Sequence, residues 1–343
     1  MNIVLMGAHN IEEYDQLKLL TELGYDCFNI GGYSNPAAPV ESLRPPLPDA
    51  PYHPDLEYAC HVKRVEHERD QPAIQGRPVI DWAKADLPQA VLDWADVIIC
   101  SAFEHTWLIP QWRRLQDSGK RIVWRTIGQS NGHNESLMAP LFKDGLEIVR
   151  YSPNERYLDH FAGETTMIRF YKDPEEWSGW RGNIGVVTNV TQHLYQRHPA
   201  TNWEFWDLAT GDLPSLPVGE GSEVIGGPGK VPFETMKDIL RSSRCYLYTG
   251  TQPASYTLGF MEALMTGIPM VSISKAWMQY PMLFEADELC GFAFADPADA
   301  ASLLRLWLND SEAATEVGIY QRSVAIDTFG MAKVGAAWQE FLG

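Results

Sequence analysis

A short loop followed by a helix gives the strongest chemical signal in the sequence. The segment PASYTLGFMEALMTGIPMVSIS occupies residues 253–274 and has the pattern of a loop, a helix and a strand. The first N–H groups of a helix lack helical partners and carry a partial positive charge, so they bind phosphate groups. Ala254 and Ser255 are small enough to let a phosphate approach the backbone, and Ser255 or Thr257 could donate to it. The alternative is that both hydroxyls only cap the helix.

Polar residues also follow the apolar runs of the N-terminal half. Glu104 and His105 come directly after the run at 96–102. Three more residues stand at the ends of other runs: Gly7, His9 and Gln129. Functional groups of open α/β sheets gather at the carboxyl ends of the strands. We expect Glu104 to act as a base and His105 to orient a substrate hydroxyl, although a lone histidine is more often structural.

Composition excludes several classes of protein. The 343 residues suffice for two domains, and a net charge of −18 disfavours binding to polyanions. The five cysteines are scattered without a CxxC pair, which indicates reduced core residues. Neither zinc-type His/Cys spacing nor a suitably placed Asp-x-Asp motif occurs, so we expect no metal site. The N-terminus lacks signal-peptide features and no apolar run spans a bilayer, which predicts a cytoplasmic protein without an integral membrane segment.

Short apolar runs alternate with amphipathic stretches, which predicts βα units and parallel sheets. Strands are predicted at 2–7, 25–30, 96–102, 121–128, 146–151, 166–170, 183–190, 203–208, 222–226, 244–250, 268–274 and 290–296. Helices are predicted at 11–23, 88–94, 106–119, 233–243, 257–266, 298–309 and 311–342, the last with a break near Phe329-Gly330. The proline-rich stretch 33–79 is predicted to be a long loop, either a lid over a substrate or an inert insertion.

One composition change divides the chain. The stretch KDPEEWSGWRGN at 172–183 is rich in Trp, Gly and Pro, so we expect residues 172–182 to form a linker. The pattern then predicts one Rossmann-like domain at 1–171 and another at 183–325. The helix at 326–343 is expected to return to the first domain.

The segment at 253–274 and its surroundings resemble the GT-B glycosyltransferases, particularly the large retaining family 4. In that family a Phe-Gly pair, a Glu-Ala pair and a Gly-x-Pro turn form the donor site. Here Tyr256-Thr257 stands at the Phe-Gly positions, and Glu262-Ala263 and Gly267-Ile268-Pro269 match by spacing. CGFAFADPADAASLLRLWLNDSEAATEVG and TFGMAKVGAAWQEFL resemble later parts of the same signature. The likeness covers about 180–343, whereas DVIICSAFEH at 96–105 is the only matching motif further upstream.

The resemblance implies the α/β GT-B fold, in which two doubly wound Rossmann-like domains face a cleft. The N-terminal domain would bind the acceptor, with Gly7, His9 and Gln129 on that side. The C-terminal domain would bind a nucleotide sugar, and Glu262 would accept hydrogen bonds from the ribose hydroxyls. The residues expected at the donor are Asn189, Gly227, Lys230, Ser255, Tyr256, Thr257, Leu258 and Glu262.

Two positions depart from the family pattern. Ala254 stands where the family has its first glutamate, which contacts the donor sugar. The strand at 183–190 runs into TNVTQHLYQRH, where Asn189 and Gln192 are uncharged and Arg197 comes late, so the usual Arg and Lys that clamp the diphosphate are missing. Either the positive charge comes from elsewhere, the donor differs, or the site is impaired.

The sequence therefore predicts transfer of a sugar from a nucleotide sugar to an acceptor hydroxyl, with retention and without metal or bound cofactor. The departing phosphate itself would take the acceptor's proton. The expected partners are the donor and an unidentified acceptor, which is a glycan, a small molecule or DNA. Modified DNA bases are an alternative because basic residues cluster at 111–125, namely Arg113, Arg114, Lys120, Arg121 and Arg125. A catalytically impaired nucleotide-sugar-binding protein or a sugar-nucleotide epimerase is the other alternative.

Overall fold

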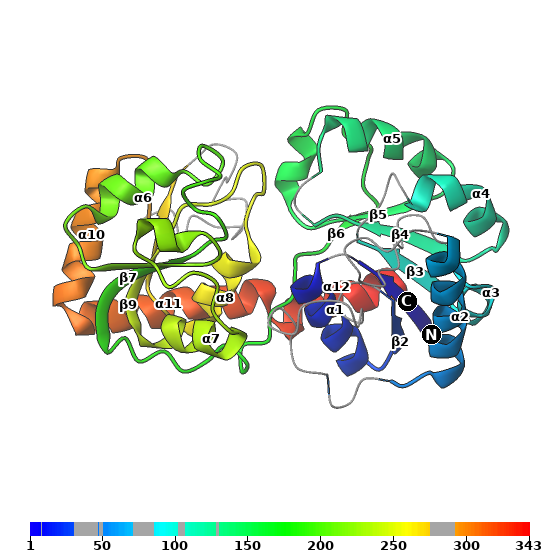
Figure 1. Ribbon diagram of the computed structural model, residues 1–343, viewed down its shortest axis with the longest axis horizontal. Helices are drawn as coiled ribbons and strands as arrows, with labels where there is room; N and C mark the ends of the chain where they lie inside the picture. The colour runs from blue at the N-terminus through cyan, green and yellow to red at the C-terminus, as the bar shows by residue number, and fades with distance from the viewer. Residues whose placement is uncertain are drawn as a thin grey trace. The chain divides into compact units, whose positions relative to one another are not determined.

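The computed structural model describes residues 1–7, 9–30, 47, 51–70, 86–101, 107–127, 130–274 and 292–343. These residues form two compact units (Figure 1). The first unit comprises Met1–Tyr151, Glu155–Phe170 and Ala337–Gly343, and the second comprises Ser152–Asn154 and Tyr171–Ala336. Residues 172–182, expected as a linker, lie in the second unit, and the last seven residues lie in the first.

The first unit contains a six-stranded parallel sheet in the order β2-β1-β3-β4-β5-β6. Its strands are β1 (Asn2–Met6), β2 (Asp26–Asn29), β3 (Val97–Cys100), β4 (Arg121–Arg125), β5 (Glu147–Arg150) and β6 (Thr166–Met167). Its helices include α1 (Asn10–Glu22), α2 (Pro54–Asp70), α3 (Gln89–Trp94), α4 (Ile109–Asp117) and α5 (Gly132–Lys143). The 3-10 helix η3 (Pro153–Tyr157) begins with two residues assigned to the second unit and ends in the first. The inner strands are buried along their length because helices cover both faces of such sheets.

The second unit contains a five-stranded parallel sheet in the order β11-β10-β9-β7-β8. Its strands are β7 (Ile184–Val190), β8 (Ser215–Val218), β9 (Ser243–Tyr248), β10 (Met270–Ile273) and β11 (Ala293–Phe294). Its helices are α6 (Trp203–Thr210), η4 (Ser222–Ile225), α7 (Phe233–Ser242), α8 (Leu258–Thr266), α10 (Pro297–Asn309) and α11 (Ser311–Phe329). Helix α12 (Met331–Leu342) begins in the second unit and ends in the first. Helix α6 packs against α10, and α8 packs against α11 (Figure 1).

Three predicted elements were wrong. Residues 203–208 form the start of α6 rather than a strand, and the buried Phe205, Trp206 and Ala209 follow helical spacing. The strand predicted at 222–226 is instead η4 (Ser222–Ile225), a 3-10 turn between two glycines with positive φ. The stretch at 33–79, predicted to be a loop, contains α2.

Strand β8 was not predicted because it contains Pro217, which lacks an N–H group to donate to a neighbouring strand. The sheet tolerates this residue because β8 lies at the edge of the described sheet, next to β7. The missed strand matters for the site, because the loop that follows it carries Gly227 and Lys230.

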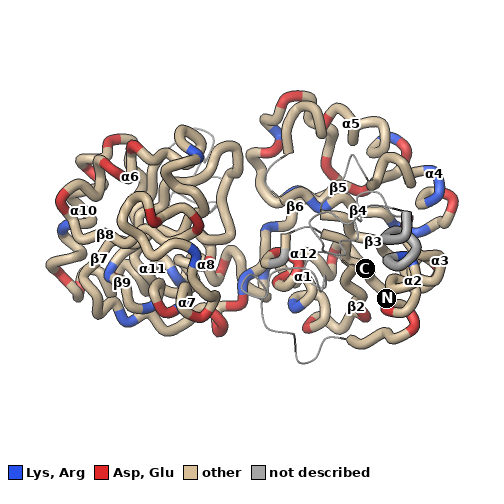
Figure 2. Tube along the Cα trace, viewed as in Figure 1, with Lys and Arg blue, Asp and Glu red and all other residues tan. Residues whose placement is uncertain are grey.

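The basic residues of 111–125 do not gather on one exposed face. Arg125 is fully buried and donates to the carbonyl oxygens of Arg150 and Ile168. Arg121 forms two hydrogen bonds with Glu147 and also donates to the last carbonyls of α12. Around α4, acidic and basic residues are interspersed (Figure 2). Arg121 and Arg125, two of the basic residues that suggested a nucleic-acid acceptor, therefore make internal contacts within the first unit.

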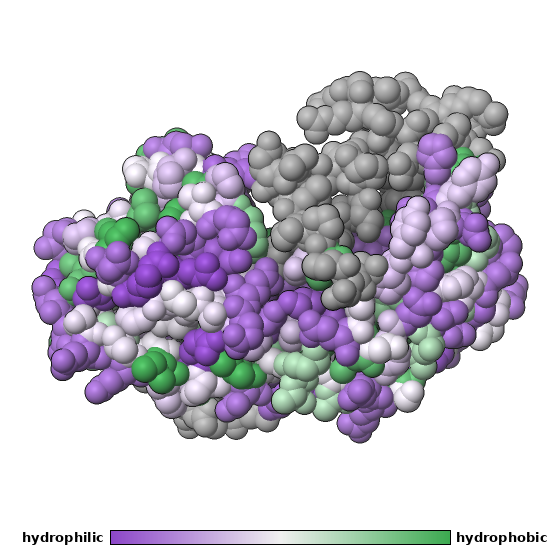
Figure 3. Space-filling view, turned by 90° about the horizontal axis from the view of Figure 1, so that it is seen from below, coloured by the Kyte–Doolittle hydropathy of each residue, from purple (hydrophilic) through white to green (hydrophobic). Residues whose placement is uncertain are grey.

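The described surface is chemically mixed. On the face drawn in Figure 3, hydrophobic residues are interrupted by hydrophilic ones. Within the described ranges no helix combines the length and hydropathy needed to cross a bilayer.

Candidate functional site

The N-terminus of α8 is the best-defined candidate for ligand binding in the second unit. Thr257 caps the helix, and its Oγ1 accepts a hydrogen bond from the N–H of Phe260 at 3.3 Å. The N–H of Thr257 donates to Oη of Tyr248, the last residue of β9, at 3.1 Å. These contacts fix the first turn while the N–H groups of Leu258 and Gly259 have no acceptor within the helix. The helix thus presents two donors and its positive end.

Gly259 brings this turn close to β7. An added Cβ at Gly259 would lie 3.3 Å from the carbonyl oxygen of Val190, the last residue of β7. In the strand order β9-β7-β8, the chain moves from β7 to β8 on one side and then to β9 on the other. Ligands of open α/β sheets bind at such a reversal, beyond the carboxyl ends of the strands. The α8 turn therefore lies where the topology favours a ligand.

The residues before α8 are more buried than the sequence suggested. Ala254, Ser255 and Tyr256 are all buried, and the Tyr256 ring packs against Phe260 and Phe329. Tyr256 is therefore part of the core beneath the loop, whereas Thr257 and Leu258 stay partly exposed at the helix start.

Glu262 lies on α8 and is almost completely buried. Its Oε1 accepts a hydrogen bond from Nζ of Lys172 at 2.8 Å, and Lys172 is fully buried. The ammonium also lies 5.4 Å from the centre of the Trp177 ring. Lys172 was missed because it falls in the stretch expected as a linker, and no local pattern marks a single lysine as the partner of a glutamate 90 residues away.

Asn189 is fully buried near the end of β7. Its Nδ2 donates to the carbonyl oxygen of Leu247 at 2.7 Å and so ties β7 to β9. Its Oδ1 is buried and has no hydrogen-bond partner among the residues the structure describes. The side chain therefore links two strands of the sheet, and its Oδ1 is an acceptor without a partner among the described residues.

The loop after β8 is compact and built on Ser222. The Ser222 Oγ accepts from the N–H of Gly229 at 2.9 Å, and its carbonyl oxygen accepts from the N–H of Gly227 at 2.9 Å. A side chain at Gly227 would collide with the carbonyl oxygen of Pro217, only 2.1 Å from the added Cβ. Lys230 is exposed at the end of this loop. Gly227 is therefore needed for packing, and Lys230 is available to a ligand.

The first unit contains the expected acceptor-side residues only in part. Glu104, His105 and Gln129 lie outside the described residues. His9 is exposed and precedes α1 without a side-chain capping bond. Gly7 follows β1, and an added Cβ there would lie 2.6 Å from Oγ of Ser101 and 2.7 Å from Cγ of Glu13.

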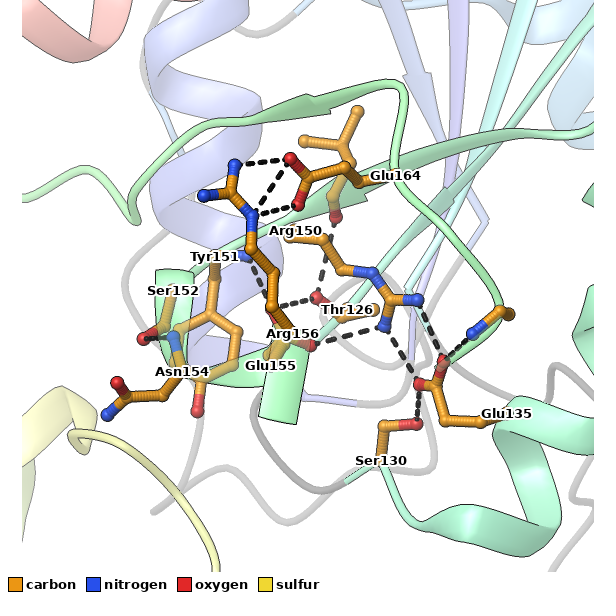
Figure 4. Close-up of polar contacts among 12 residues, drawn as sticks. Thr126, Ser130, Glu135, Arg150, Tyr151, Ser152, Asn154, Glu155, Arg156 and Glu164 are labelled. Atoms are coloured by element: carbon orange, nitrogen blue, oxygen red, sulfur yellow. Dashed lines mark hydrogen bonds and ion pairs between the residues drawn. The ribbon is translucent and has the colours of Figure 1, made fainter. Parts of the chain in front are cut away.

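A buried ionic network fixes the segment on both sides of Gln129 (Figure 4). Arg150 donates to both carboxylate oxygens of Glu135 at 2.8 Å, and Ser130 donates to the same carboxylate. Glu155 accepts from Oγ1 of Thr126 at 2.9 Å. Burial alone would raise the pKa of Glu135, but the hydrogen bonds and charge of Arg150, with Ser130 and the N–H of residue 162, lower it overall. Thr126 and Ser130 are thereby held in place by Glu155 and Glu135.

No group of three or more His, Cys, Asp and Glu side chains suited to a metal ion occurs within the described ranges.

Comparisons with known proteins agree with this architecture. Residues 212–326 match the family described as glycosyl transferase-like. The Anabaena protein Alr3699/HepE in complex with UDP-glucose is 13% identical, with a TM-score of 0.65 over 100% of this chain and 99% of that one. A glycosyltransferase from Rickettsia africae is 9% identical, with a TM-score of 0.60 over 99% and 97% of the two chains.

A further solved structure, described as trehalose-6-phosphate from Escherichia coli bound with UDP-2-fluoro glucose, is 13% identical. Its TM-score is 0.60 over 100% of this chain and 99% of that one. No curated protein matches the sequence. The expected resemblance and the expected α/β fold with two parallel sheets are confirmed.

Proposed function

We propose that this chain, a glycosyltransferase of the GT-B fold, transfers a sugar from a UDP-sugar to an acceptor hydroxyl. The observation that carries the proposal is the partly exposed start of α8 beside the carboxyl end of β7, at the reversal of strand order. UDP is favoured over other nucleotides because two proteins of similar fold were solved with UDP-sugars.

The diphosphate is bound by the N–H groups of Leu258 and Gly259, which have no acceptor within α8. Thr257 shapes this turn through its cap. Lys230 supplies a positive charge from the loop after β8, where its side chain is exposed. This arrangement replaces the Arg and Lys that the sequence lacks after β7.

Glu262 binds the ribose hydroxyls with the carboxylate oxygen that Lys172 does not occupy. The pairing of Lys172 with Oε1 holds the orientation of the carboxylate. The loop at Gly227 borders the base, and the Oδ1 of Asn189 is a further acceptor at the end of β7. Tyr256 supports this loop from the core, and Ser255 lies beside it.

The reaction proceeds with retention and without metal. The departing phosphate takes the proton of the acceptor hydroxyl on the same face of the sugar, so no protein nucleophile is required. The acceptor, a glycan or a small molecule, binds at the carboxyl edge of the first sheet near Gly7, His9 and Gln129. Glu104 and His105 orient its hydroxyl. Transfer takes place in the cytoplasm.

Nucleotide binding tests the proposal first. We would measure thermal unfolding with UDP, GDP, ADP and their glucose, N-acetylglucosamine and mannose derivatives. A ligand that binds only the native state adds about 2.7 kcal/mol at 100 times its Kd. We expect the largest shift with UDP or a UDP-sugar. If none of these ligands shifts the transition, the donor site does not exist as described and the impaired-protein alternative replaces it.

Two variants localise the site. Glu262→Gln keeps the shape of the side chain but removes its charge, and it should weaken UDP binding in titration calorimetry. Glu316→Ala on the exposed face of α11 is the matched control and should bind UDP as the wild type does. Consumption of UDP-glucose, followed with and without added sugars, then separates a transferase, which needs an acceptor for the glucose, from a hydrolase or epimerase, which consumes the donor without an acceptor.

A further inference from the structure

The first unit contains a small, partly open cavity whose lining includes four polar side chains. It is bounded by Glu12, Glu13 and Gln16 of α1 and by Ser101, which follows β3, with apolar residues of β1 and β3 as its other walls. The cavity measures about 10 Å³. A space of this size accommodates a single oxygen atom of the size of water. The cavity therefore fits one small polar group rather than a whole sugar ring.

The four polar side chains are each more than nine-tenths buried. Ser101 donates to Oε2 of Glu12 at 3.4 Å, and Nδ2 of Asn29 donates to Oε2 of Glu13 at 3.4 Å. Gly7 approaches the same group so closely that any side chain there would collide with Ser101 and Glu13. The absence of a Cβ at Gly7 is thus required for this arrangement.

Gln16 gives an independent indication of a ligand. Its Nε2 is buried and has no hydrogen-bond partner among the described residues. A buried donor without a partner costs about 1–3 kcal/mol, so such groups are uncommon in folded proteins. Gln16 lies one turn after Glu12 on the same face of α1, and both line the cavity. The side chain that carries the unused donor and the side chain of Glu12 therefore line the same cavity.

The chemistry of the walls selects the ligand. The lining residues that the structure describes include two carboxyl groups and no cation, so they disfavour a phosphate or another anion. A cation would meet the carboxylates favourably but would also meet the amide N–H of Gln16. A hydroxyl group suits both the carboxyl group and the amide N–H, because it donates one hydrogen bond and accepts others.

We propose that this cavity binds one hydroxyl group of an alcohol or sugar, which accepts a hydrogen bond from Nε2 of Gln16 and donates one to the carboxylate of Glu12. The proposal deepens the proposed function, and the assignment of this hydroxyl to the sugar acceptor rests on that function. The position at the carboxyl ends of β1 and β3 agrees with such a role.

The experiment uses ethylene glycol, the smallest diol, as the probe. Crystals of the full chain would be soaked in it, with Gln16→Leu as the test variant and Gln339→Leu, an exposed residue of α12, as the control. We expect a diol oxygen within hydrogen-bond distance of Nε2 of Gln16 in the wild type and the control, and no diol in Gln16→Leu. A water molecule in place of the diol in the wild type, or equal diol binding in Gln16→Leu, would overturn the proposal.

UDP binding to the same proteins keeps the two proposals separate. If Gln16→Leu binds UDP with the wild-type Kd but loses the diol, the hydroxyl site is supported independently of the donor site. If the wild type binds the diol but not UDP, the proposed function fails while the cavity remains a hydroxyl site. If UDP binds and the diol does not enter the cavity, only the hydroxyl site is wrong.

Discussion

Nζ of Lys172 and Oε1 of Glu262 lie 2.8 Å apart, and both side chains are buried in the second unit. The pair joins a segment just before β7 to the helix whose start we propose to bind the diphosphate. A buried ion pair is costly to break from one side only, because the remaining charge loses its partner in a medium of low polarity. The pair therefore links the stability of the second unit to the orientation of Glu262.

Removing either partner alone should destabilise the protein. We expect Lys172→Met to lower the free energy of unfolding by about 3–5 kcal/mol, since Glu262 then keeps a buried charge without compensation. The double variant Lys172→Met/Glu262→Leu should lose much less than the sum of the single changes. Urea unfolding followed by circular dichroism gives all four free energies of the cycle. Additive single effects would show that the two groups do not interact in solution.

Glu12 should make stability depend on pH in the opposite sense to an ordinary carboxylate. Its pKa is raised from 4.5 to about 7, chiefly by burial, while Arg125 and Ser101 lower it and Glu13 and Asp15 contribute to the rise. The folded state then holds a proton that the unfolded chain has already lost between these two values. Stability should therefore fall as pH rises from about 4.5 to about 7, by an amount on the order of 3 kcal/mol.

The variant Glu12→Gln tests this dependence because it stays neutral. The difference in unfolding free energy between Glu12→Gln and the wild type should be small below pH 4.5 and should favour the variant by the full amount above pH 7. Urea unfolding across this range measures the difference. A difference that does not change with pH would place the pKa of Glu12 near its ordinary value.

Arg150 and Arg156 form a matched pair for testing burial. Arg150 is fully buried against Glu135 and Glu155, whereas Arg156 pairs with Glu164 while half exposed (Figure 4). Arg150→Met should cost at least about 3–5 kcal/mol because it leaves two buried carboxylates without their cation. Arg156→Met should cost about 1 kcal/mol or less. Similar losses in urea unfolding would contradict the burial difference.

The strands that are buried on both faces were predictable from the sequence. The runs at 2–7, 96–102 and 121–128 correspond to β1, β3 and β4, because inner parallel strands are continuous apolar runs. The break near Phe329-Gly330 was also predictable, since α11 ends at Phe329 and α12 begins at Met331.

The candidate sites were less predictable because they depend on contacts between distant residues. Glu262 was found from the resemblance, but its partner Lys172 stands in a stretch without periodicity. Helix α1 was predicted, yet polar residues of a helix are normally assigned to its solvent face. In the fold, Glu12 and Gln16 are instead buried and line a cavity beside the sheet. Only the tertiary structure determines which side of such a helix is covered.

Tyr248 links the end of β9 to the start of α8, so its hydroxyl should affect both stability and nucleotide binding. Its Oη accepts the N–H of Thr257 at 3.1 Å, and burial raises the pKa of the phenol, which therefore stays protonated. Tyr248→Phe leaves this N–H without its acceptor and should cost about 1–3 kcal/mol. The loosened turn should also weaken UDP binding several-fold in titration calorimetry. Thr257→Ser keeps both the backbone N–H and the capping hydroxyl, so it should bind UDP nearly as the wild type does. Unchanged UDP binding in Tyr248→Phe would argue against the α8 turn as the diphosphate site.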